Sequence, residues 1–133
     1  MTQEEVVQLT EVAMHPLYAA AIEVVERLED ARQRVVHLAA ELAQAEYELR
    51  VRKARVERDL IKKVGGERAL APTAEDRARV FTLALDADAE YREKLQRWRE
   101  VSSALEEAKV EVAALRDRLN VMLAAMRAAS EGK

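Results

Sequence analysis

The sequence predicts an all-α protein: one long antiparallel helical hairpin with coiled-coil-like packing, preceded by a short helix. Three observations support this prediction. Half of the 133 residues are apolar, yet they include only one Phe, one Trp and three Tyr. Charged residues make up 35% of the chain. Three Gly and two Pro leave few places to turn. Such a composition is typical of long helices rather than of a thick globular core.

The first expected element is a short helix over residues 3–14. Thr2 and Glu5 have the spacing of a capping box, in which each side chain accepts a hydrogen bond from the other residue's backbone N–H. Pro16 ends this segment, because a proline disfavours helical geometry at the residue before it, here His15.

A long helix is expected over residues 16–64. Proline is well suited to a first helical turn, and Pro16 stands there. The next breaker is the pair Gly65-Gly66, which can supply a left-handed C-terminal cap. A turn is therefore expected over residues 65–73.

A second long helix is expected over residues 74–129. Thr73 is suited to its N-cap, with Asp76 at the third helical position. Nothing interrupts the chain again before Ser130-Glu131-Gly132. At 1.5 Å per residue the two long helices would measure roughly 70–85 Å each, and we interpret residues 1–133 as one helical domain.

Each long helix carries an apolar residue every three or four positions, which predicts a coiled-coil-like seam. On the first helix these residues form two rows: Ala21, Leu28, Val35, Leu42, Leu49, Val56 and Leu17, Val24, Ala31, Leu38, Ala45. On the second helix the rows are Tyr91, Trp98, Leu105, Val112, Leu119, Met126 and Val101, Ala108, Leu115, Met122, Ala129.

A short connection makes the two helices antiparallel neighbours and fixes which residues lie at the same height. Leu42 is then level with Trp98. Arg52 and Asp88, each of which interrupts an apolar row, are also level with each other. We predict that Arg52 and Asp88 pair and set the register, as a buried polar residue does in a zipper. The alternative is that both side chains point into solvent.

Further apolar residues lie off the seam, and a helix that is apolar on more than one stripe needs more than one neighbour. The helix at 3–14 is expected to cover the end near Leu119 to Met126. The remaining residues predict a homo-oligomer: Ile22, Val25, Val36, Val80, Leu83, Leu85, Val110, Val121, Leu123.

Positive charge gathers where the chain reverses, although the whole chain carries −3. Residues 1–49 hold three basic and ten acidic groups, and residues 80–133 hold nine and ten. Residues 50–79 hold ten basic groups against five acidic ones. The ten basic residues, the candidate nucleic-acid-binding set, are Arg50, Arg52, Lys53, Arg55, Arg58, Lys62, Lys63, Arg68, Arg77 and Arg79.

A localised basic patch suits phosphate binding, because each Lys or Arg that neutralises a phosphate releases counterions. Phe81 and Tyr47 are the nearest aromatic residues for base stacking. The alternative is a solvated helix face whose arginines pair with neighbouring carboxylates, those of Glu57, Asp59, Glu75 and Asp76.

No catalytic constellation is visible in the sequence. His15 and His37 lie on different segments, without ligand spacing around them, and Gly65-Gly66-Glu67 lacks the features of a phosphate loop. There is no Cys, so thiolate metal sites are excluded. We expect a non-enzymatic protein without a metal or cofactor. No run is long enough for a membrane span, and the acidic start is unlike a signal peptide, which favours the cytoplasm and no membrane partner.

Three segments resemble the UvsY-type recombination mediators of tailed phages and related small helical accessory proteins of phages. They are the start of the long helix at His15-Pro16-Leu17-Tyr18, the basic stretch from Arg50 to Lys63, and the segment from Val112 to Asn120. The chain departs from that family's pattern at Met122 to Arg127, which lacks an aromatic-rich ending.

The resemblance implies an oligomeric protein that helps to load a recombinase onto single-stranded DNA. Its phosphate contacts would come from Arg50, Arg52, Lys53, Arg55, Arg58, Lys62 and Lys63. The sequence thus favours a DNA-binding accessory protein for recombination. The alternative class is a coiled-coil adaptor, scaffold or inhibitor whose basic end docks on an acidic protein.

Overall fold

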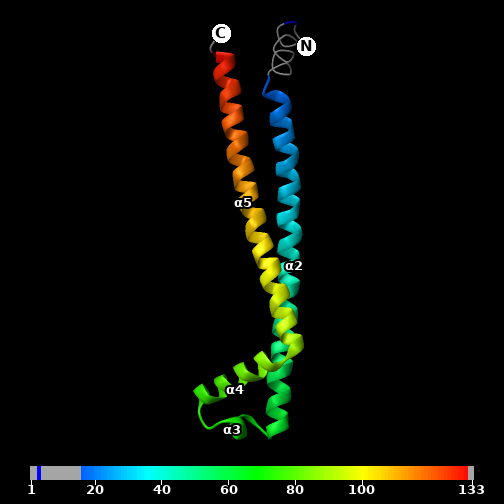
Figure 1. Ribbon diagram of the computed structural model, residues 1–133, viewed down its shortest axis with the longest axis vertical. Coiled ribbons are helices and arrows are strands. Elements are labelled where there is room, and N and C mark those ends of the chain that lie inside the picture. Colours follow the sequence, from blue (N-terminus) through cyan, green and yellow to red (C-terminus); the bar gives the residue numbers. More distant parts are fainter. Residues whose placement is uncertain (1–2, 4–15, 132–133) are drawn as a thin grey trace. The chain divides into compact units, whose positions relative to one another are not determined.

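The computed structural model describes residue 3 and residues 16–131 of the chain, and every regular element in that part is a helix (Figure 1). In order they are α2 (Tyr18–Val64), α3 (Glu67–Leu70), α4 (Ala74–Ala87) and α5 (Ala89–Glu131). The predicted all-α class is confirmed. The predicted helix at 3–14, with its capping box, lies outside the described residues apart from Gln3.

The chain divides into two compact units, and the boundary between them falls inside both long helices. The first, which we call the terminal unit, comprises residues 1–36 and 106–133. The second, which we call the central unit, comprises residues 37–105. The interpretation of residues 1–133 as one domain stays a prediction.

In the terminal unit, an apolar cluster joins α2 to α5. Its buried members are Val24, Leu28, Ala31 and Leu115, and Val112, Leu119 and Met122 pack against them. Removing a Leu or Val side chain from water stabilises a fold by about 1.5–3 kcal/mol. The burial of this cluster is therefore the main interaction that holds α2 against α5 in the terminal unit.

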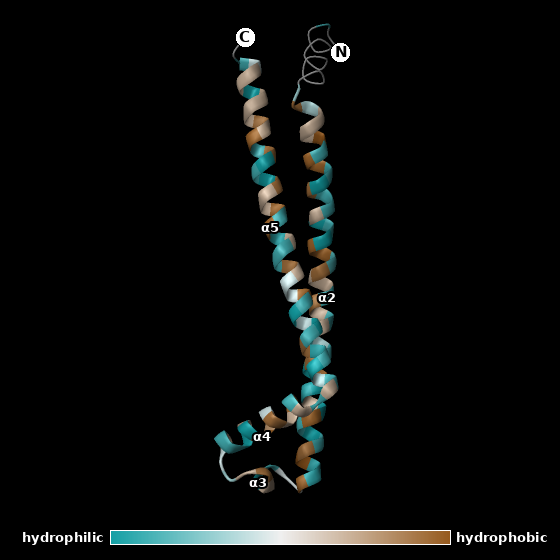
Figure 2. Cartoon of the chain, viewed as in Figure 1, coloured by the Kyte–Doolittle hydropathy of each residue, from teal (hydrophilic) through white to brown (hydrophobic). Residues whose placement is uncertain are grey.

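The predicted seam is confirmed by burial along both helices. Every residue of the four predicted rows is buried or partly buried, except Ala129, which is exposed. The polar residues between the rows give the alternation of hydrophilic and hydrophobic colour along the helices in Figure 2.

In the central unit, α2 and the first part of α5 form an antiparallel helical hairpin. Contacts between them run in opposite directions along the two helices: Arg52 meets Asp88, Glu48 meets Lys94, and Glu46 meets Trp98. Residue numbers fall on α2 as they rise on α5, as the predicted antiparallel register requires.

The turn after α2 is built as expected, with one addition. Gly65 and Gly66 both have positive φ, 89° and 133°, and both donate backbone N–H groups to the Ile61 carbonyl, at 3.1 and 3.0 Å. This is the left-handed cap that only glycine adopts without strain. The expected turn at 65–73 also contains one helical turn, α3.

The expected single helix over residues 74–129 is wrong, because the chain leaves helical geometry at Asp88. There φ is −84° and ψ is 112°, which ends α4 and starts α5. Neither Gly nor Pro causes the break. Instead, the Asp88 N–H donates to the Leu85 carbonyl at 3.1 Å, and the Asp88 carboxylate accepts from the Tyr91 N–H at 2.8 Å. Asp88 therefore caps both helices, and α4 leaves the line of α5 (Figure 1).

Candidate nucleic-acid interface

The last part of α2 carries most of the predicted basic residues. From Arg50 to Val64 the helix has no breaker. Lys62 and Lys63 stand in its last turn, where positive charge complements the negative end of the helix dipole. Arg50, Lys53, Arg55, Lys62 and Lys63 are all exposed to solvent.

These side chains surround the helix rather than lining one face. Arg55, Arg58 and Lys62 share one side, because they are spaced three and four apart. Arg50 and Lys53 lie on a different side. The arrangement is a basic collar along about four turns of α2, which can meet phosphates from several directions but does not define a single groove.

The remaining predicted residues are on α3 and α4. Arg68 on α3 is exposed. The Arg77 Nη1 donates to the Ala71 carbonyl at 3.3 Å, and Arg79 lies 3.8 Å from Asp76. Thr73 accepts from the Asp76 N–H at 3.1 Å, which confirms the predicted N-cap and orients this first turn.

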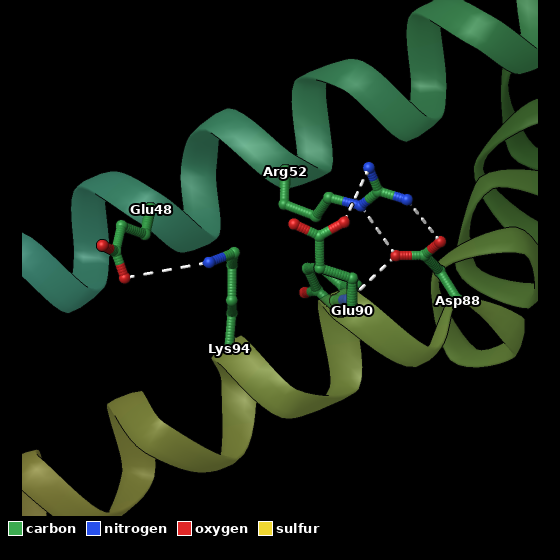
Figure 3. A network of polar contacts seen from close by, with 6 residues as sticks. Glu48, Arg52, Asp88, Glu90 and Lys94 are labelled. Carbon is green, nitrogen blue, oxygen red and sulfur yellow. Dashed lines mark hydrogen bonds and ion pairs between the residues drawn. The ribbon is translucent and has the colours of Figure 1, made fainter.

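Arg52 is bound within the protein rather than presented to solvent. Its Nε and Nη2 donate to the two Asp88 carboxylate oxygens, at 2.9 and 2.7 Å. Its Nη1 lies 3.1 Å from Glu90 (Figure 3). The Arg52 and Asp88 side chains are only 25% and 20% exposed. The predicted pair is confirmed, and its bidentate form makes it strong and directional.

The pair changes the acidity of both partners. The pKa of Asp88 is lowered from 3.8 to about 2, chiefly by the hydrogen bonds from Arg52 and also by the Tyr91 N–H, against the effect of partial burial. The same hydrogen bond raises the pKa of Arg52. Both groups are therefore charged near neutral pH, and Arg52 leaves the set of cations that we retain for phosphate binding.

Six of the ten predicted residues make neither an ion pair nor a side-chain hydrogen bond with any residue that the structure describes. Arg58 lies 3.6 Å from Asp59, and both side chains are more than 60% exposed, so that contact is weak. The six are Arg50, Lys53, Arg55, Lys62, Lys63 and Arg68. We call them the free cations.

Of the two aromatic residues near the basic collar, only Tyr47 is well exposed, at 60%. Phe81 on α4 is half-buried. Base stacking normally strengthens single-strand binding, and here at most these two side chains are placed to supply it.

Other chemistry finds little support in the described residues. His37 lies 3.0 Å from Glu41 and is 72% exposed, and His15 lies outside the described part. Within residues 16–131 no group of His, Asp and Glu side chains is placed to hold a metal ion. A surface hollow in the central unit has a charged lining, unlike the apolar pockets that take small molecules; it is lined by Glu48, Glu90, Glu93, Lys94, Gln96, Arg97 and Glu100.

Several functional contacts escaped the sequence analysis. Lys94 lies 3.9 Å from Glu48, and the Trp98 indole N–H donates to Glu46 at 3.3 Å. Such exposed pairs cannot be recognised from the sequence, because charged residues are abundant and many pairings are equally plausible. The capping role of Asp88 had one faint signal, the acidic Glu90 two residues later, but Ala87 and Ala89 favour a continuous helix.

No protein-family model, no curated protein and no solved structure matches this chain. None of the helices in residues 16–131 is long and apolar enough to cross a membrane.

Proposed function

We propose that this chain is a non-enzymatic, cytoplasmic accessory protein that binds single-stranded nucleic acid through the basic collar of its central unit. The observation that carries the proposal is the set of six free cations: Arg50, Lys53, Arg55, Lys62, Lys63 and Arg68. A carboxylate-rich chain of net charge −3 holds these cations within a short stretch and does not neutralise them.

Binding of this kind is electrostatic and independent of base sequence. Each neutralised phosphate releases counterions, so the logarithm of affinity falls linearly with the logarithm of salt concentration, by about 0.7 per contact on a single strand. Six contacts give a slope of about −4. Tyr47, being exposed, can add stacking on a base.

The resemblance to phage recombination mediators extends the proposal to a biological role. The protein would hold single-stranded DNA along α2 and present it to a recombinase, with self-association to cover the strand. This role needs no chemistry from the chain itself. The role agrees with a central unit in which positive charge is concentrated on a short stretch of chain.

A fluorescence-anisotropy titration with a labelled poly-thymidine oligonucleotide tests the proposal. The variant Lys62→Gln/Lys63→Gln/Arg68→Gln removes three of the six free cations, and its salt slope is expected to fall from about −4 to about −2. The matched control, Arg97→Gln/Arg99→Gln/Arg116→Gln, removes three exposed arginines of α5 and is expected to keep the wild-type slope. Absence of binding by the wild-type protein at low salt would refute the proposal.

A second candidate is a protein–protein module, favoured by the apolar residues that remain exposed off the seam. They include Val36, Leu83, Val110 and Val121, each about 70% exposed. Leu85, also predicted off the seam, is buried, and Val80 is half-buried. An acidic partner protein would then occupy the basic collar. Charge reversal at Arg55 and Arg58, tested against both ligands, separates the two candidates.

A further inference from the structure

In the central unit, α2 has a second apolar face directly opposite the seam. Residues spaced three or four apart share one side of a helix, and here they are Ala40, Ala43, Tyr47, Val51 and Ala54. Tyr47 is 60% exposed, the three alanines are exposed, and Val51 is half-buried. We call these five residues the outer face of α2. A helix with two opposite apolar stripes requires a second neighbour.

The corresponding side of α5 in the same unit is different. Opposite its seam residues α5 presents Glu93, Gln96 and Glu100, all exposed and polar. In the hairpin of the central unit, the side facing away from the seam is therefore apolar on α2 and polar on α5. Because α5 already meets solvent with a polar surface, the missing neighbour belongs to α2.

The outer face of α2 is symmetric about Tyr47. Four positions away on either side stand Ala43 and Val51, and seven positions away stand Ala40 and Ala54. We infer that a second copy of this chain docks here, its α2 antiparallel to the first, with a two-fold axis at Tyr47. Each Tyr47 then meets the partner's Tyr47, and Ala43 lies against the partner's Val51. Such an isologous contact closes into a dimer.

The charges beside the outer face complement one another in this arrangement. The flanking residues Glu41 and Glu46 precede Tyr47, and the basic residues Arg50 and Arg55 follow it. Glu48 also follows Tyr47, but it lies 3.9 Å from Lys94 of the same chain. A two-fold axis brings like sides of the two helices together. Glu46 is then beside the partner's Arg50, and Glu41 is beside the partner's Arg55.

The size of the face sets the expected strength of the dimer. It spans 15 residues of α2, or about 22 Å, at the small end of specific interfaces. An aromatic residue stands at its centre and ion pairs stand at its rim, as in interfaces of measurable affinity. We expect a dimer that dissociates on dilution. The dimer engages Arg50, Arg55 and Tyr47, which the proposed nucleic-acid interface also uses, and leaves Lys53, Lys62, Lys63 and Arg68 free. The inference does not depend on the proposed nucleic-acid function.

Disulfide cross-linking tests the two-fold axis directly, because the chain has no cysteine of its own. A Tyr47→Cys variant is expected to form a covalent dimer under mild oxidation, seen on a non-reducing gel. Its matched control, Gln96→Cys on the polar side of α5, is expected to stay largely monomeric. Equal cross-linking at both positions, or sedimentation of the wild-type protein as a monomer at every concentration, overturns the inference.

A charge exchange tests the antiparallel pairing without altering the apolar face. Glu41→Arg and Arg55→Glu are each expected to weaken the dimer about tenfold or more in analytical ultracentrifugation, and the double variant is expected to restore it. Circular dichroism confirms that each variant is folded. All measurements are made without nucleic acid, so they are independent of the binding titration. An oligomer that persists unchanged in a Tyr47→Glu variant assigns self-association to another surface and overturns the inference.

Discussion

In the terminal unit α2 meets α5 through the apolar side chains of Val24, Leu28, Ala31 and Leu115, whereas in the central unit charged groups also join the two helices. No ion pair joins α2 to α5 within residues 16–36 and 106–131. In the central unit Arg52 alone binds two carboxylates of the opposite side, Asp88 and Glu90.

The difference shows how one chain separates stability from register. Apolar residues that recur every seven positions pack nearly as well after a shift of one heptad, so they hold two helices together without fixing their alignment. A bidentate Arg–Asp pair has a single matching position and a defined geometry. We interpret the apolar rows, which are buried in both units, as the main source of packing energy and the Arg52–Asp88 pair as the element that sets the alignment.

The largest expected effect comes from the apolar cluster. Leu115 is 5% exposed, and Leu115→Ala is expected to lower the free energy of unfolding by about 2–5 kcal/mol, from lost burial and the cavity left behind. Urea denaturation followed by circular dichroism measures this. The matched control, Val121→Ala on the same helix, is 70% exposed and is expected to change stability by less than about 0.5 kcal/mol. Equal losses in the two variants would contradict our assignment of the packing energy.

An intermediate, pH-dependent effect is expected at Asp88. Its pKa falls from 3.8 in the unfolded chain to about 2 in the fold, so its contribution to stability is complete above about pH 5 and is lost as pH falls toward 2. The difference in urea midpoint between wild type and Asp88→Asn should therefore be constant from pH 5 to 7 and should narrow below pH 4. A gap that stays constant down to pH 2 would show that the carboxylate charge does not stabilise the fold.

The smallest effect is expected at the peripheral pair of Glu48 and Lys94. Their charged atoms are 3.9 Å apart and both side chains are partly exposed, so Glu48→Gln is expected to cost about 0.5 kcal/mol or less, and nothing measurable at high salt. Glu107→Gln, at an exposed position of α5, is the control. If Glu48→Gln lowered the free energy of unfolding as much as Leu115→Ala, surface charge would matter as much as apolar packing, contrary to our ranking.

Much of the fold was predictable because its signals are local or periodic. The heptad rows identified the seam, the paired glycines identified the end of α2, and the coincidence of Arg52 with Asp88 identified their ion pair. The break in the second helix was not predictable from propensity, since Ala87 and Ala89 favour continuation. It depends on a carboxylate that is oriented by a residue 36 positions away.

The sequence predicted which residues make up the candidate site but not which of them are free to bind a ligand. The sequence identified the ten basic residues, but their division into free cations and residues held by the protein depends on tertiary contacts, as at Arg52 and Arg77. Periodicity identified Arg55, Arg58 and Lys62 as one face. That the free cations of α2 all meet solvent, on more than one side of the helix, is known only from the exposure of each side chain.

The break at Asp88 lies in a backbone that is free to be helical, since the residues there are Ala, Asp and Ala. A bend made by proline is built into the chain, whereas this one is imposed by a side chain and its partner. A substitution at Asp88 that removes both caps is therefore expected to favour a continuous helix from α4 into α5, while the apolar rows remain untouched. The direction in which α4 points is thus open to evolutionary change independently of the scaffold that carries it.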